Sequence, residues 1–236
     1  MSAALPNLAV VIPTLNEERA IASCLHAVGT PPGAAIVVTD GGSADATLEI
    51  VARERPDARV VHGAPGRGGQ LRRGAAAVTA HAYIFVHADC RLPQGWYEAV
   101  SGALADPTTT LGYFRLHTEA PAGGSRSPLA RAWWRLADLR SSGFGLPYGD
   151  QAQHVRREVL EAVGGFPEIP LMDDLELARR CRRLGRLVRI PLEVRTTARR
   201  FAQHPIRARL CMATFPLLYR LGVSPARLLR WYPVVR

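Results

Sequence analysis

The sequence contains no lysine, so all 30 basic residues among its 236 are arginine. Alanine, glycine, proline and arginine are abundant, and we attribute the missing lysine to a GC-rich genome. The few cysteines fit neither a zinc-binding nor a CxxC spacing: Cys24, Cys90, Cys181 and Cys211. They predict reduced thiols in a cytoplasmic protein and exclude a disulfide-stabilised scaffold. Long hydrophobic runs are also missing, since the apolar stretch at 8–13 is too short for a membrane span or a signal peptide.

Aromatic residues make up only 7% of the chain and are not interleaved with the arginines as the stacking platforms of a nucleic-acid binder would be. Positive charge is concentrated late in the chain. Residues 1–125 contain 9 arginines and 11 acidic residues, whereas residues 126–236 contain 21 arginines and 9 acidic residues. A basic second half suits an anionic small ligand, a nucleic acid or an acidic membrane surface, and the shortage of aromatic residues ranks nucleic acid last.

The first half of the chain alternates apolar strands with amphipathic helices. The predicted strands cover 8–13, 35–40, 58–63 and 82–89, and the predicted helices cover 16–28, 45–55 and about 70–80. Alternation with short links is typical of a mostly parallel central sheet that carries helices on both faces. We therefore predict an α/β, Rossmann-like fold.

The second half is less regular. Its predicted elements are a strand at 111–119, a loop at 120–128, helices at 129–139 and 172–185, a strand at 151–157 leading into a short helix, late strands at 187–191 and 194–201, and a helical tail from 205. We find no linker or repeat, and we predict a single domain over 1–236. Its parts are 1–125, 126–204 and the tail at 205–236.

Polar or small residues follow every predicted strand of the first half, where an open parallel sheet binds its ligands. They are Pro13, Thr14, Asn16 and Glu17 after the first strand, Asp40 and Gly42 after the second, Arg67, Gln70 and Arg72 after the third, and His87, Ala88 and Asp89 at the fourth. Each group alone also fits a helix cap or a turn. Together they predict a nucleotide-sized crevice that contains carboxylates.

Asp89 is the carboxylate that capping explains least, because it follows a strand too apolar for a sheet edge. An acid at this position fits a divalent cation, Mg²⁺ or Mn²⁺, that is held together with the phosphates of a ligand. His87 either completes such a site or donates a neutral hydrogen bond. The sequence therefore predicts a metal and phosphate site around Asp89.

Two acids and two arginines stand out in the second half. Asp173 and Asp174 open a helix, where acids are stabilising. They are also candidates for a general base whose pKa is set by a neighbouring carboxylate. Arg199 and Arg200 follow a strand and are placed to clamp an anion.

The segments VVIPTLNEE, VVTDGGSADAT, FVHADCRLP, GDQAQHVRREVLEAVGGFPEIPLMDDLELARR and TTARRF occur in the order of the motifs of family 2 glycosyltransferases. Over residues 8–202 the chain resembles that family, which has the GT-A fold. It is similar in particular to a compact bacterial subgroup of arsenosugar-type and selenium-associated glycosyltransferases, which includes selenosugar synthases. The resemblance implies a nucleotide-sugar-binding half at 1–125 and a catalytic, acceptor-binding half at 126–204. It also implies transfer of a sugar from a UDP-sugar to a small anionic acceptor such as selenophosphate.

The resemblance also implies a role for each matching residue. The donor would contact Pro13, Thr14, Asn16, Glu17, Asp40, Gly42, Arg67, Gln70, Arg72, His87, Ala88 and Asp89. Asp89 matches the last acid of the DxD motif that holds metal and diphosphate, and Asp174 matches the general base, with Asp173 beside it. The acceptor or its phosphate would contact Gly149, Asp150, Gln151, Arg199 and Arg200. The chain departs from the family pattern at His87, which replaces the first DxD acid, at Asp173, where Glu is usual, and in lacking QxxRW.

Two other functions fit parts of the sequence. One is an O-glycosyltransferase with a small-molecule or lipid-linked acceptor, since the basic tail with Trp231 and Tyr232 could touch a membrane. We instead expect the tail to pack on the sheet. The other is a sugar nucleotidylyltransferase, although the basic glycine-rich loop that such enzymes carry after the first strand is missing. The sequence predicts no oligomeric state.

Overall fold

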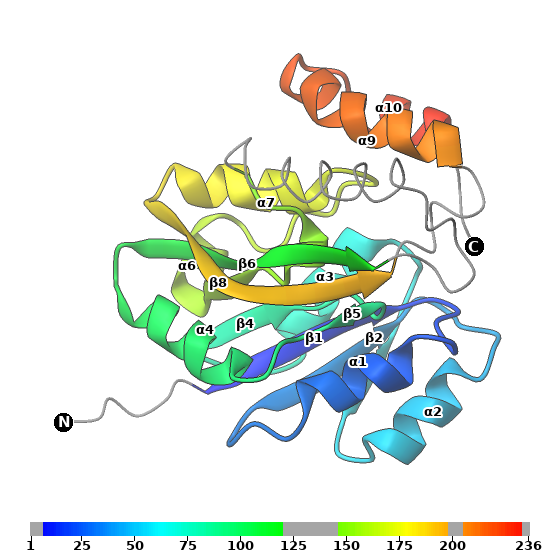
Figure 1. The fold of residues 1–236 in the computed structure, drawn as a ribbon, viewed down its shortest axis with the longest axis vertical. Coiled ribbons are helices and arrows are strands. Elements are labelled where there is room, and N and C mark those ends of the chain that lie inside the picture. Colours follow the sequence, from blue (N-terminus) through cyan, green and yellow to red (C-terminus); the bar gives the residue numbers. More distant parts are fainter. Residues whose placement is uncertain (1–6, 120–145, 198–204, 233–236) are drawn as a thin grey trace.

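The computed structural model describes residues 7–119, 146–197 and 205–232. In these ranges an eight-stranded sheet runs through the molecule in the order β3-β2-β1-β4-β7-β6-β8-β5 (Figure 1). The strands are β1 (Leu8–Thr14), β2 (Ala35–Asp40), β3 (Arg59–His62), β4 (Ala82–Phe85), β5 (Cys90–Arg91), β6 (Thr109–Glu119), β7 (His154–Arg156) and β8 (Arg186–Thr197). Strands β1 to β4 pair in parallel, as do β6 and β8, whereas β7 is antiparallel to its neighbours β4 and β6.

Helices cover both faces of this sheet because its central strands are buried on both sides. The helices are α1 (Ile21–Val28), α2 (Thr47–Glu54), α3 (Arg67–Ala76), α4 (Trp96–Ala105), α6 (Arg157–Ala162), α7 (Asp173–Arg182), α9 (Pro205–Arg220) and α10 (Pro225–Trp231). Along β1, Leu8 and Val10 point to the core under α1, α2 and α4, whereas Ala9 and Val11 point to the core under α3, α6 and α7. The predicted α/β fold with a mostly parallel sheet is confirmed.

Several predicted boundaries are wrong. The strand predicted at 151–157 covers only His154–Arg156, and the helix predicted at about 70–80 is Arg67–Ala76. The first helix begins at Ile21 and not at residue 16, because Asn16 has a φ of 56° and the chain turns before the helix. Strand β4 ends at Phe85, four residues before Asp89. The two late strands are one strand, β8, in which Pro191 lies at a shift of register where no ladder hydrogen bond is required of it. The predicted helix at 129–139 lies outside the described residues.

The tail lies over α7, at the far side of that helix from the sheet (Figure 1). Its buried residues Cys211, Phe215 and Leu228 form a small core of their own with Leu171 and Met172, just before α7. The expectation that the tail packs on the sheet is therefore wrong. In the described part of the chain, no helix combines the length and the apolar character that crossing a membrane requires.

Candidate active site

The loops after β1 and β2 are fastened to each other by hydrogen bonds. The side-chain oxygen of Asn16 accepts a bond from the Ala44 N–H (2.9 Å), and its own N–H donates to Ser43 Oγ (3.0 Å). The Glu17 N–H donates to Thr47 Oγ1 at 2.8 Å. Pro13 is half-buried beside them. The crevice-forming segments predicted after these two strands thus lie side by side, and short polar residues hold them in place.

Asp40 is 1% exposed and orders the loop after β2. Its carboxylate accepts bonds from the Thr14 hydroxyl, from the N–H groups of Gly42 and Ser43, and from the Ser43 hydroxyl. Burial by itself would raise the pKa of Asp40, but these bonds outweigh it and lower the pKa. Gly42 has a φ of 95°, which lets the backbone turn back toward the carboxylate. These bonds occupy the carboxylate, so Asp40 holds the loop after β2 in its shape.

The three donor residues predicted on α3 point in different directions. Gln70 is buried and donates to the carbonyls of Thr14 (2.8 Å) and Thr39 (2.7 Å), so it ties the ends of β1 and β2 together. Arg72 bonds the Gly164 carbonyl and forms an ion pair with Glu168, in the loop after α6. Arg67 alone points toward the acids of α7. The sequence placed all three at the donor, because the spacing of residues along a helix does not show which parts of the protein each side of the helix contacts.

His87, Asp89 and Cys90 form a compact group after β4. One ligand atom from each lies within 4.8 Å of the others, and Ala88 between them is buried. Cys90 was not predicted here. Burial, together with the charges of Asp89 and Asp150, raises the pKa of its thiol well above the ordinary value, so it stays protonated. The nitrogen and oxygen ligands of His87 and Asp89 fit a divalent cation such as Mn²⁺ that is shared with phosphate oxygens.

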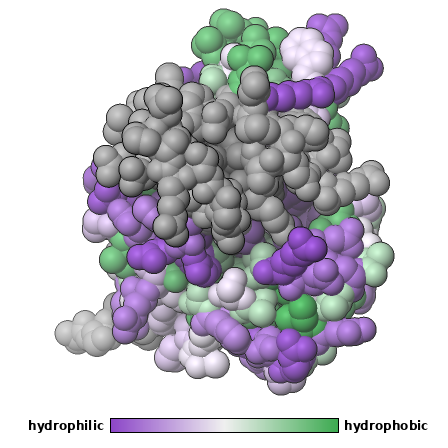
Figure 2. Space-filling view, turned by 45° about the vertical axis from the view of Figure 1, so that its right-hand side comes forward, coloured by the Kyte–Doolittle hydropathy of each residue, from purple (hydrophilic) through white to green (hydrophobic). Residues whose placement is uncertain are grey.

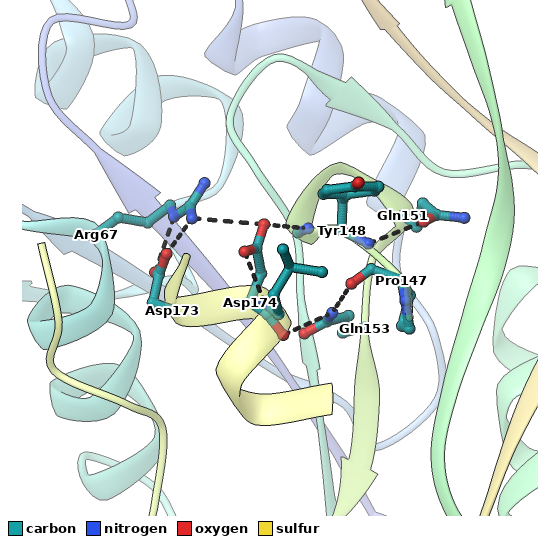
Figure 3. A network of polar contacts seen from close by, with 9 residues as sticks. Arg67, Pro147, Tyr148, Gln151, Gln153, Asp173 and Asp174 are labelled. Atoms are coloured by element: carbon teal, nitrogen blue, oxygen red, sulfur yellow. Dashed lines mark hydrogen bonds and ion pairs between the residues drawn. The ribbon is translucent and has the colours of Figure 1, made fainter. Parts of the chain in front are cut away.

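Asp173 and Asp174 begin α7, and Arg67 faces both of them (Figure 3). The Arg67 guanidinium donates two hydrogen bonds to Asp173 and lies 3.5 Å from Asp174 Oδ2. Asp174 Oδ2 also accepts a bond from the Gly149 N–H (2.7 Å), and its Oδ1 accepts one from the Leu175 N–H. Burial raises the pKa of Asp174, and the charge of Asp173 adds to this rise, although Arg67 opposes it. A carboxylate with a raised pKa is suited to accept a proton.

Gly149 joins these two groups. It begins the short 3₁₀ turn η1 (Gly149–Gln151), and a Cβ placed on it would lie 2.7 Å from His87 Nε2 and 3.2 Å from Asp174 Oδ2. The predicted phosphate side and the predicted base are therefore neighbours, separated by one glycine. The turn is held by Gln151, whose amide donates to the Phe114 carbonyl at 2.8 Å.

Asp150 and Gln153 extend this contact region. The carbonyl oxygen of Asp150 lies 3.6 Å from the Cys90 sulfur, so η1 also touches the group after β4. Gln153 was missed by sequence reasoning. Its buried amide donates to the carbonyls of Pro147 and Asp174, so it holds the segment before η1 against the start of α7 (Figure 3). The predicted anion clamp, Arg199 and Arg200, lies outside the described residues.

A cavity of about 310 Å³ lies between α7 and α9, and one of its lining residues, Leu175, follows Asp174 in the chain. It is lined by Leu146, Leu175, Arg179, Pro216, Tyr219 and Arg220. Tyr219 anchors α9 here through a 2.6 Å hydrogen bond from its hydroxyl to Glu176. Burial would raise the pKa of Glu176, but bonds from Arg179, Tyr219 and Arg180 lower it to about 2. Nothing in the sequence indicated that the tail would form a wall of this cavity.

The family follows from a comparison with known proteins. The family described as glycosyl transferase family 2 matches residues 9–164, about two thirds of the chain, and the chain belongs to this family. Protein RfbJ of Shigella flexneri is 36% identical to it over 86 residues. That match covers 35% of this chain and 64% of RfbJ, which is less than two thirds of RfbJ's length.

Solved structures with the same fold include three glycosyltransferases of low identity. Mannosyltransferase PcManGT from Pyrobaculum calidifontis, in complex with GDP-Man and Mn²⁺, gives a TM-score of 0.65 at 22% identity over 96% of this chain and 68% of that one. TarS of S. aureus (residues 1–349) gives a TM-score of 0.61 at 16% identity over 94% of this chain and 68% of that one. Glucosyl-3-phosphoglycerate synthase from Mycobacterium tuberculosis, in complex with Mn²⁺, UDP and phosphoglyceric acid, gives a TM-score of 0.60 at 21% identity. The match covers 93% of this chain and 80% of that one. They confirm the predicted GT-A fold.

Proposed function

We propose that this protein is a glycosyltransferase that moves a sugar from a nucleotide diphosphate sugar, in the first place a UDP-sugar, to an acceptor bound beside Asp174. One observation carries the proposal: His87 and Asp174 both lie against the backbone of Gly149, and Asp89 belongs to the same group of side chains as His87. A donor diphosphate and an acceptor nucleophile need this adjacency, because the bond from the anomeric carbon to the diphosphate breaks as the bond to the acceptor forms. Membership of family 2 favours transfer over the nucleotidyl chemistry considered from the sequence.

The donor side of the proposed site is the edge formed by β1, β2 and β4. The loops that contain Pro13, Thr14, Asn16, Glu17, Asp40 and Gly42 would border the nucleoside. His87, Ala88 and Asp89 would face the diphosphate. A divalent cation held by Asp89, with His87 as a second ligand, would supply positive charge to the departing diphosphate. Relatives of the same fold have been solved with Mn²⁺ and a nucleotide or nucleotide sugar.

Asp174 is proposed as the residue that takes or orients the acceptor proton. Its raised pKa suits that role, and its hydrogen bonds from Gly149 and Leu175 fix the direction of the carboxylate. Asp173 is proposed to assist it from its pair with Arg67. In this arrangement Arg67 compensates part of the negative charge that two adjacent buried acids bring.

The acceptor is proposed to be a small anion, with selenophosphate as the specific candidate from the resemblance to selenosugar synthases. The cavity lined by Leu175, the residue that follows Asp174 in the chain, favours an anion, because Arg179 and Arg220 also line it. The glucosyl-3-phosphoglycerate synthase structure likewise contains phosphoglyceric acid, a small anion. Gly149, Asp150 and Gln151 would border the acceptor, with Arg199 and Arg200 as further anion contacts. Selenophosphate is already a strong nucleophile, so Asp174 would then orient it more than deprotonate it.

A second candidate is transfer to a lipid-linked acceptor. One observation favours it: the exposed Leu217 of α9 and the exposed Leu221 just after α9 follow the cavity residues Pro216 and Arg220 in the chain. In either case we propose that 1–236 act as one domain. The four cysteines are buried and unpaired, which supports the cytoplasm as the proposed compartment.

The test is release of UDP or GDP from a panel of nucleotide sugars, each with Mg²⁺, Mn²⁺ or a chelator. Acceptors are selenophosphate, phosphate, an alcohol and an undecaprenyl phosphate, against a water control. Asp174→Asn is the inactive reference, and Glu158→Gln on the exposed surface of α6 is its matched control. Acceptor-dependent release that Asp174→Asn abolishes supports the proposal, and the acceptor that triggers it decides between the two candidates. No release above water with any pair would sink it.

A further inference from the structure

The outer side of α9 carries an apolar stripe that no described part of the chain covers. Leu210, Ala213, Leu217 and Leu221 are all exposed, and the three leucines have exposed fractions of 62%, 60% and 72%. Their spacing of three and four residues puts them on one side of a helix. The helical turn continues to Leu221, whose N–H bonds the Leu217 carbonyl at 3.0 Å.

The opposite side of α9 accounts for the packing of this helix. Cys211 and Phe215 are buried in the small core against Leu171 and Met172, and Tyr219 is fixed to Glu176. The helix is therefore already seated on α7, and the leucine stripe contributes nothing to that contact. Four exposed apolar positions in one row are a patch of the kind that marks an interaction surface.

α10 adds an aromatic residue and positive charge to this surface. Trp231 is 54% exposed, and its carbonyl accepts bonds from Arg207 (3.1 Å) and from the Cys211 thiol, so it lies beside the part of α9 that contains Leu210. Arg227 and Arg230 on α10 are exposed. Figure 2 shows hydrophobic side chains gathered over α9 and α10 at the top of the molecule, with strongly hydrophilic ones beside them.

The charge of the tail has one sign. Residues 205–232 contain five arginines and no aspartate or glutamate. A stripe of leucines beside tryptophan and arginine, with no acid to repel anionic headgroups, has the composition of a helix that lies in the plane of a membrane interface. A protein partner with an acidic surface would match the arginines but would leave the row of leucines unexplained.

We propose that α9 and α10 form a docking surface for an anionic membrane. The leucine stripe enters the boundary between headgroups and acyl chains, Trp231 lies at the headgroup level, and the arginines contact the lipid phosphates. Docking requires neither a particular sugar nor a particular acceptor, so it stands or falls independently of the proposed activity.

Co-sedimentation of the purified full-length protein with vesicles tests the proposal without any substrate. The vesicles are phosphatidylcholine alone and phosphatidylcholine with about 30% phosphatidylglycerol. We expect sedimentation with the anionic vesicles, weakened by salt because screening acts on the arginines, and little with the neutral ones. L217S/L221S should lower the partition coefficient at least tenfold, and R227Q/R230Q should lower it severalfold on anionic vesicles only.

Leu184→Ser is the matched control, because Leu184 is 54% exposed at the end of α7, outside the tail. It should sediment as the wild type does, and thermal melts of every variant should stay close to the wild-type melt. Wild-type protein that remains in the supernatant with both vesicles would overturn the proposal. So would a dimer, seen by light scattering, that L217S/L221S dissociates while no vesicle binds, since the stripe would then be an interface between copies of the chain.

Discussion

Gly149→Ala tests whether the donor side and the base side of the proposed site are truly one site. The added methyl group would stand 2.7 Å from His87 Nε2, 2.9 Å from His87 Cε1 and 3.2 Å from Asp174 Oδ2. The first two distances are shorter than any ordinary contact, so the His87 ring or the turn η1 has to move. Asp174 also loses its fixed geometry if the turn moves, since the Gly149 N–H is one of its hydrogen-bond donors.

The size of the effect follows from how far the groups must shift. Relaxation of the 2.7 Å approach to an ordinary contact of about 3.5 Å displaces the His87 ring, or the backbone of Gly149, by about 0.8 Å. A displacement of about 1 Å near reacting groups costs about 100-fold in rate. Overpacking by one methyl group costs about 1–3 kcal/mol of the free energy of unfolding. We expect the low end of that range, because a ring can rotate, and hence a melting temperature about 2–4 °C lower.

The assay is nucleotide release under saturating donor and acceptor, together with a thermal melt of the same preparations. Gly102→Ala is the matched control. Gly102 lies inside α4, where an added methyl group would meet no atom of the described residues within 4 Å, so this variant should keep full activity. It should also raise stability by about 0.5–1 kcal/mol, because alanine is the better helix former. A Gly149→Ala enzyme with kcat within about twofold of the wild type, against the expected loss of about 100-fold, would mean that His87 and Asp174 do not act in one site.

Three further outcomes follow from the site. Asp174→Asn should lower kcat about 100- to 10,000-fold, and the wild-type rate should fall as pH drops through the raised pKa of Asp174, while Glu158→Gln changes neither. Tyr219→Phe should lower the free energy of unfolding by about 1–2 kcal/mol at pH 7, since it removes a hydrogen bond to a charged acceptor. Because this bond helps to lower the pKa of Glu176 to about 2, the difference in melting temperature should shrink as pH falls from about 4.5 toward that value. His87→Asp should raise the rate with Mg²⁺ relative to Mn²⁺, because Mg²⁺ prefers oxygen ligands, as nucleotide release with each metal would show.

Each of these outcomes has a result that contradicts it. A fully active Asp174→Asn enzyme would remove Asp174 from the chemistry, leaving it only a structural part in the start of α7. A loss of stability in Tyr219→Phe that stays the same from pH 7 down to pH values below about 2 would mean that Glu176 does not act as a charged partner. Unchanged metal preference in His87→Asp would place the cation, if one acts, away from this residue.

Residues predicted for the site at strand ends lie close together in the structure, whereas those predicted along one helix point in different directions. Asp89 and Asp174 were proposed from their places after a strand and at the start of a helix, and the structure brings their surroundings together at Gly149. Gln70 and Arg72 lie on the same helix as Arg67, yet they bond strand ends and a distant loop. The direction of a helical side chain depends on what packs against it, and that partner is remote in the sequence.

Local sequence patterns were enough to predict the alternation of strands and helices, the burial of both faces of the sheet and the positions of the carboxylates. These features depend on the local period of apolar residues, which any stretch of chain carries with it. Three features depend on the folded chain: Arg67 pairs with Asp173, Gly149 separates His87 from Asp174, and the tail rests on α7 with Leu210, Leu217 and Leu221 outward. Such contacts join residues as far apart as the 106 positions between Arg67 and Asp173, and they exist only after the sheet has formed and its loops have come together.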